Sequence, residues 1–170
     1  LGDSLGPSDF RKNASRLALL LESCSRELVS LLDFRLPEPC GDEQALNYLK
    51  SLGTAKGLDD AEFDLAFAES LSALRVETRK SLAAKAKQFI SFKNNSTSSF
   101  KFSDCSLGNI VFAGCYLQQN KNFNAAVADY CALLGLPQDM ILNVTDGKNA
   151  FLLAKNTDGE ILQGEEDRSE

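Results

Sequence analysis

The residues best suited to chemistry lie in one stretch, residues 102–114, where a polar cluster runs directly into an apolar segment. Either Asp104 or Ser106 could cap a helix there, because a short side-chain oxygen accepts a hydrogen bond from an unpaired backbone N–H group. Such N–H groups and the positive end of the helix dipole attract anions such as phosphate. Gly108 and Gly114 carry no Cβ and allow a ligand or another backbone to come close. The stretch therefore predicts either an anion site at a helix N-terminus or the start of an ordinary buried helix.

Histidine is absent from the 170 residues, and this narrows the chemistry that the chain can perform. Zinc ligation by Cys and His is nearly excluded, and so are Ser-His and Cys-His nucleophile pairs. Acid–base chemistry would have to come from Asp, Glu, Lys, Cys or Tyr. The five cysteines are odd in number and include no C-x-x-C pair, which favours free thiols in a reducing cytoplasm.

The overall charge bears on the class of partner. The net charge of -6 and the pI of about 4.8 argue against a general binder of nucleic acid or of an anionic membrane, although they allow a local basic pocket. The apolar stretches are too short to span a bilayer, and no signal peptide is visible. We therefore expect a cytoplasmic domain with no nucleic-acid or membrane partner. A homodimer stays open.

Helical spacing of apolar residues dominates most of the chain. It predicts helices over residues 8–34, 42–52, 60–92, 106–119 and 123–134, the last closed by Gly135 as its C-cap. Five basic residues decorate the third of these helices: Arg75, Arg79, Lys80, Lys85 and Lys87. They are interpreted as a solvated face, with a basic wall facing a phosphorylated ligand as the alternative.

The period changes after Pro137, and the pattern predicts strands over residues 140–144, 150–155 and 160–162. A turn signal at residues 156–159 makes the last two a hairpin. Helices on one side of a few strands do not close an architecture. The chain is then either a helix-rich α+β domain or, as we expect, part of an α/β domain whose first strands lie upstream.

The run at residues 102–110 resembles the His-Ser-x-Gly-Asn motif of CofD-like proteins. That family contains the 2-phospho-L-lactate transferases of deazaflavin-cofactor synthesis and the related gluconeogenesis factors. Three further segments agree in order, and a fourth is similar to a segment of one subgroup. Residues 7–11 are similar to a Gly-Asp-Ile-Arg segment, and 31–37 to a segment of the plant and fungal subgroup. Residues 141–145 resemble Val-Leu-Pro-x-Thr, and 158–165 resemble a closing Asp-Gly…Gly-Glu pattern.

The resemblance implies a Rossmann-like three-layer α/β fold that is incomplete. Residues 1–170 would be a single CofD-like domain lacking its N-terminal Gly-rich part. Residues 8–92 would be mainly a helical excursion, and residues 100–165 a helix pair plus the C-terminal strands of the sheet.

The resemblance also assigns roles to particular positions. Asp9 and Arg11 would be catalytic, with Asp9 as a Mg²⁺ ligand and the Arg11 fork on phosphate oxygens. The implied phosphate-binding residues are Ser106, Gly108, Asn109 and Thr145. The plainer alternatives are that Asp9 is only a helix cap, that Arg11 is a surface residue and that Thr145 shapes a turn.

The chain departs from the family pattern at four positions: Ser8, Lys12, Cys105 and Asn143. Cys105 stands where the family has its histidine. It is either a reactive thiol beside a helix N-terminus, where thiolate is favoured, or a small packing residue.

The function that the resemblance implies is a Mg²⁺-dependent transferase that moves a phosphate-containing group from a nucleotide-activated donor. The ligand would be a nucleotide or a deazaflavin-type molecule. The alternative is a regulatory protein of the gluconeogenesis-factor type, which binds a nucleotide sugar without turnover. A third hypothesis, from the acidic surface and long helices, is a helical interaction scaffold.

Overall fold

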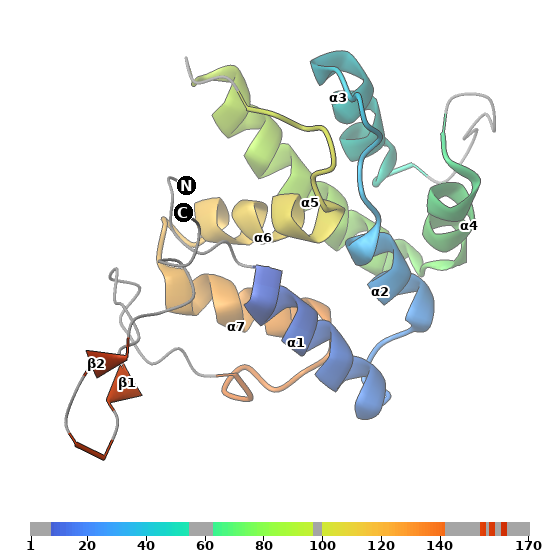
Figure 1. Ribbon diagram of the computed structural model, residues 1–170. Coiled ribbons are helices and arrows are strands. Elements are labelled where there is room, and N and C mark those ends of the chain that lie inside the picture. The colour runs from blue at the N-terminus through green and yellow to red at the C-terminus, as the bar shows by residue number, and fades with distance from the viewer. Residues whose placement is uncertain are drawn as a thin grey trace.

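The computed structural model describes residues 8–54, 63–96 and 100–141, and residues 154–155, 157–158 and 161–162. These residues form seven helices and two short strands. The helices are α1 (Ser8–Leu20), α2 (Arg26–Asp33), α3 (Asp42–Ser51), α4 (Leu65–Ala73), α5 (Val76–Asn94), α6 (Leu107–Gln118) and α7 (Phe123–Leu133). The strands are β1 (Ala154–Lys155) and β2 (Ile161–Leu162). The helices form one body, and the strand pair lies to one side of it (Figure 1).

Helix α6 lies at the centre of the helical body and packs against α5, α7, α2 and α1 (Figure 1). It is apolar on all sides, and a helix of that kind is stable only when it is surrounded. Its buried residues are Leu107, Gly108, Ile110, Val111, Phe112, Ala113, Gly114 and Cys115. The stretch that stands out in the sequence is therefore also the centre of the core.

Helices α5 and α6 cross at Gly114. A Cβ placed on Gly114 would lie 2.2 Å from the backbone oxygen of Lys85, so only glycine allows this approach. The Lys85 side chain is itself buried, and its Nζ donates to Gln118 Oε1 at 2.6 Å and forms an ion pair with Asp129 of α7. The prediction that Lys85 belongs to a solvated face was wrong, because the ion pair and the amide oxygen replace water around the ammonium group.

Both long helices of the prediction are interrupted. The helix expected over residues 8–34 is broken between α1 and α2, where Glu22 has a left-handed φ of 51° and Ser25 caps α2 by accepting a hydrogen bond from Leu28 N. The helix expected over residues 60–92 is broken at Leu74, which is extended (ψ 147°) and buried. In both cases the two pieces face the same core, so the apolar spacing continues through a break that the period does not reveal.

The predicted Rossmann-like α/β fold is wrong for the part of the chain that the structure describes. That part is mainly helical, and its one sheet is a two-stranded antiparallel pair in which Ala154 lies opposite Leu162 and Lys155 opposite Ile161. The other β pairing there is a single bridge between Arg35 and Ser106. Residues 140 and 141, the start of an expected strand, form a bend after α7, and residues 142–150 lie outside the described residues. A three-layer α/β fold needs a central sheet of several paired strands for its helices to pack on. In this structure the helices bury their apolar faces against one another.

The predictions for the shorter helices and for the hairpin are confirmed. Helices α3, α6 and α7 lie where the spacing predicted them, and Gly135 after α7 has the left-handed φ of 69° that a C-cap glycine adopts. The hairpin near the C-terminus is confirmed at the residues that pair. None of the helices described combines the length and the apolar character that a membrane crossing requires.

Candidate functional site

Arg11 meets three other predicted site residues, which lie close together near residue 108 and far from it in the sequence, where α1, α2 and α6 join. Arg11 of α1 is 2% exposed, and its Nε donates to Asn109 Oδ1 of α6 at 3.1 Å. The Arg11 side chain lies against Gly108, where a Cβ would come within 2.5 Å of the Arg11 Cδ. Ser106 is buried beside them. The sequence thus identified residues that do share one place in the fold.

Hydrogen-bond donors at the start of α6 find their acceptors in main-chain carbonyl groups at the end of α2. Leu107 N donates to Phe34 O at 2.9 Å, and Ser106 Oγ donates to Leu32 O at 3.0 Å. Ser106 is the N-cap residue of α6, as one of the two alternatives predicted, but no side chain accepts a capping hydrogen bond, because Ser106 Oγ is directed to Leu32 O. The carboxylate of Asp104 instead pairs with Arg35 at 3.0 Å.

Arg11 is engaged by α2 as well as by α6. Its guanidinium forms an ion pair with Asp33 and donates to Leu32 O at 3.4 Å. An arginine side chain can satisfy several acceptors at once because its fork carries five N–H donors. Arg11 therefore ties three helices together at the edge of a surface groove.

Two of the predicted positions cannot be placed. The side chain of Asp9 and the whole of Thr145 lie outside the described residues. Within the described part of the chain, no three or more His, Cys, Asp or Glu side chains gather so as to hold a metal ion. The assignment of Mg²⁺ to Asp9 therefore stays a prediction.

Cys105, which takes the place of the family histidine, is half-buried. Burial raises the pKa of its thiol, the nearby Arg35 lowers it and Asp104 raises it again, with a net upward direction. Because the thiolate is the reactive form, this direction favours the packing role over the reactive role.

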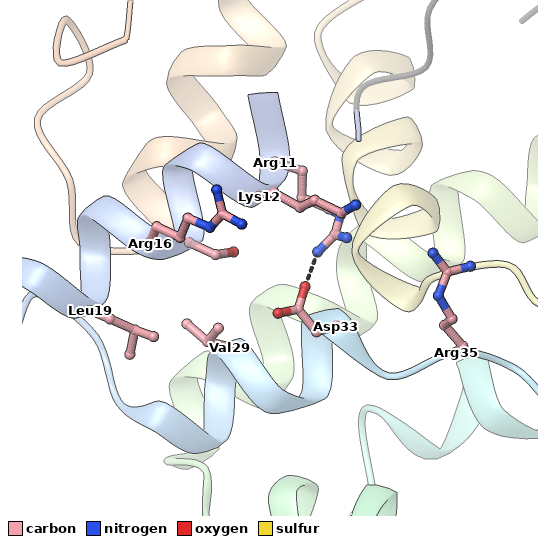
Figure 2. A pocket seen from close by; sticks show the side chains of 8 residues that line it. Arg11, Lys12, Arg16, Leu19, Val29, Asp33 and Arg35 are labelled. Atoms are coloured by element: carbon pink, nitrogen blue, oxygen red, sulfur yellow. Dashed lines mark hydrogen bonds and ion pairs between the residues drawn. The ribbon is translucent and has the colours of Figure 1, made fainter. Parts of the chain in front are cut away.

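A groove of about 410 Å³ opens between α1 and α2 beside this junction. Figure 2 shows Leu19 on α1 facing Val29 on α2, with the Arg11–Asp33 pair at the other end. Four cationic side chains line the groove: Arg11, Lys12, Arg16 and Arg35. The remaining lining residues are Ser15, Leu19, Val29 and Asp33. In a chain of net charge -6, this is a local basic site of the kind that the composition allowed.

The cations in the groove are not equally available. Arg11 is paired with Asp33, and Arg35 with Asp104. Lys12 and Arg16 are exposed, and neither has a carboxylate partner among residues 10–54, 63–96 and 100–141, whose side chains the structure describes. They lie one turn apart on α1, so both reach the same side of that helix. An anion in the groove would meet these two side chains first.

Sequence reasoning identified Arg11 but not the groove. Lys12 was noted only as a departure from a motif, Asp33 only as part of the similar segment at residues 31–37, and Ser15 and Arg16 were not considered. The spacing of Arg11, Ser15 and Leu19 along one helical face was a usable signal. The second wall of the groove had no such signal in the sequence, since it depends on α2 folding back along α1.

Comparisons with protein-family models, with curated proteins and with solved structures gave no match to this chain.

Proposed function

We propose that this chain binds a small phosphorylated ligand in the groove between α1 and α2, without turnover. The observation that carries the proposal is the pair of uncompensated cations, Lys12 and Arg16, in a groove that also holds two further arginines. Guanidinium and ammonium groups are the side chains that bind phosphate oxygens best. The protein would act as a regulatory binding module, in a cytoplasm where its cysteines stay reduced.

The size of the groove supports this class of ligand. Its volume of about 410 Å³ falls within the range of roughly 300–1,000 Å³ that is typical of small-molecule sites. An extended nucleic acid would meet an acidic surface beyond the groove, because the net charge is -6. A compact anion fits the charge distribution better than a polymer does.

The test is a thermal-shift and calorimetric screen of the chain against inorganic phosphate, GDP, GTP, UDP and UDP-sugars, with and without Mg²⁺. A ligand at one hundred times its Kd stabilises the folded state by about 2.7 kcal/mol. For a chain of this length that is a rise in Tm of roughly 5–10 °C. If no phosphate-containing ligand raises the Tm of the folded protein, the proposal is wrong and the scaffold hypothesis gains.

Variants locate the site. Arg16→Gln removes one uncompensated charge and should weaken binding about tenfold, and adding Lys12→Gln should weaken it further by a similar factor. Arg26→Gln is the matched control, because Arg26 is exposed on α2 but does not line the groove. Equal losses in all three proteins would mean that the anion binds elsewhere or responds only to net charge.

A transferase is the second candidate, and one observation favours it. The resemblance to CofD-like proteins singled out Arg11 and, far from it in the sequence, Gly108 and Asn109, and Arg11 contacts both. In such a reaction the acceptor hydroxyl would displace the nucleotide from the donor phosphorus, so that one phosphate ester forms, one phosphoanhydride bond breaks and a proton is released.

Product analysis distinguishes a binding module without turnover from a transferase. Incubation with a nucleotide-activated phosphate donor and Mg²⁺ should release no nucleotide if the chain only binds. Steady release above the no-protein rate, lost in Arg11→Lys but retained in Arg26→Gln, would favour the transferase.

A further inference from the structure

One carboxylate lies among the cations of the groove. The side chain of Asp33 is 50% exposed, and Arg11 engages its Oδ1. Within the described residues, Oδ2 of the same carboxylate makes no hydrogen bond. An ionised carboxylate is only an acceptor, so Oδ2 suits a hydroxyl or ammonium donor and repels a bare anion. A ligand made only of phosphate would leave this group unmatched.

A second polar group on the α1 wall is also unmatched. Ser15 is 2% exposed and lines the groove, and its Oγ has no hydrogen-bond partner in the part of the chain that the structure describes. Buried hydroxyl groups are normally paired, and each exception calls for an explanation. A ligand hydroxyl in the groove would supply the missing partner, because a serine hydroxyl both donates and accepts.

The third feature is apolar. Leu19 on α1 and Val29 on α2 lie across the groove from each other, away from the Arg11–Asp33 pair (Figure 2). Carbon atoms of a short chain or ring could pack between them and leave water. The groove therefore offers cations for an anionic group, an acceptor for hydroxyl groups and an apolar wall for a carbon skeleton.

We propose that the ligand is a phosphate ester of a polyol, such as a sugar phosphate or a glycerol phosphate. Its phosphate contacts Lys12 and Arg16, its hydroxyl groups contact Asp33 Oδ2 and Ser15 Oγ, and its carbon skeleton packs against Leu19 and Val29. Asp33 and Ser15 thus determine specificity, whereas the cations provide affinity. This inference rests on the proposed function, since it concerns the same groove.

The test compares two esters with the same phosphate group by isothermal titration of the whole chain. Glycerol 3-phosphate carries two hydroxyl groups, and n-propyl phosphate carries none. We expect glycerol 3-phosphate to bind at least tenfold more tightly than the propyl ester, and the propyl ester to bind more tightly than inorganic phosphate, because its carbon chain packs against Leu19 and Val29. The preference should fall in Ser15→Ala and in Asp33→Asn and stay unchanged in Arg26→Gln.

The outcomes separate the two proposals. If the two esters bind equally well, the polyol inference is overturned and the phosphate site stands. If the preference is intact in both Ser15→Ala and Asp33→Asn, its assignment to these side chains is overturned. If neither ester nor inorganic phosphate binds, both the inference and the proposed function fail. Ser15→Ala keeps the test decisive even if Asp33→Asn disturbs the junction with Arg11, because it removes only an unpartnered hydroxyl.

Discussion

Replacement of Gly114 by alanine should destabilise the chain, although alanine is the better helix former. Gly114 lies in the middle of α6, where it meets α5. A Cβ at this position would be 2.2 Å from the Lys85 carbonyl oxygen and 2.9 Å from the Lys85 Cα. The three atoms nearest to that Cβ all belong to the Lys85 backbone, so no side-chain rotation relieves the overlap. The two helices would have to separate by roughly 1 Å to restore ordinary contact distances.

The magnitude follows from two opposed effects. Alanine gains about 1 kcal/mol over glycine in a helix interior, and overpacking a well-filled core costs typically about 1–3 kcal/mol. Because the obstacle is rigid, and because moving α5 would also disturb the Lys85–Asp129 ion pair, we expect the upper part of that range or beyond. The net loss should be about 2 kcal/mol, or roughly 4–8 °C in Tm for a chain of this length.

The assay is urea unfolding followed by circular dichroism, with Gly41→Ala as the matched control. Gly41 undergoes the same chemical change, but a Cβ there meets nothing within 4 Å. The control should lose less than about 1 kcal/mol, because glycine is only a modestly better N-cap than alanine. If Gly114→Ala is as stable as the wild type, the close crossing of α5 and α6 is wrong.

Three further predictions concern the core and its ionisable groups. Lys85→Met leaves Asp129 without its partner and should cost about 3 kcal/mol in urea unfolding, and adding Asp129→Leu should restore more than half of it; no recovery would mean that the pair does not act as a unit. Burial, and then the charge of Asp129, raise the pKa of Cys115 from 9.0 to about 12. As pH rises, the unfolded chain therefore loses the Cys115 proton before the folded chain does. The contribution of this thiol to the free energy of unfolding is fully present below about pH 9 and is lost as pH rises from about 9 toward 12. Unfolding measured from pH 7 to 11 should show a shallower alkaline decline in Cys115→Ala than in wild type, and parallel curves would contradict the buried thiol. Gly135→Ala forces a side chain into a left-handed conformation 2.5 Å from Ser23 O and should cost at least about 1 kcal/mol in the same assay; an unchanged midpoint would rule out the C-cap described after α7.

The elements predicted well are those whose signals are local. The apolar run of α6 and the glycine and proline after α7 act within a few residues, and they gave helices with correct ends. The long helices failed because tertiary contacts set their ends. Ser23 Oγ, in the turn after α1, donates to Leu134 O at 2.8 Å, and the partner lies at the far end of α7. No local pattern contains that contact.

The expected sheet failed for a related reason. A short apolar run such as residues 140–144 can be a strand only if other strands are present to pair with it. The resemblance to CofD-like proteins supplied those partners by implication. Among the described residues, the strands that pair are those of the β1–β2 hairpin, which is itself a local structure, and the other pairing is a single bridge between Arg35 and Ser106.

The candidate site, too, has features that local sequence determines and others that only the tertiary structure determines. The sequence by itself determined that α1 carries Arg11, Ser15 and Leu19 along one face and Lys12 with Arg16 beside it, because helical geometry follows from local spacing. It also determined that residues 102–114 would be central, since an apolar helix must be surrounded. Only the tertiary structure decided that α2 turns back along α1 and brings Asp33 to Arg11. That arrangement depends on burying several helix faces at once, a free energy that belongs to the whole core and to no single segment.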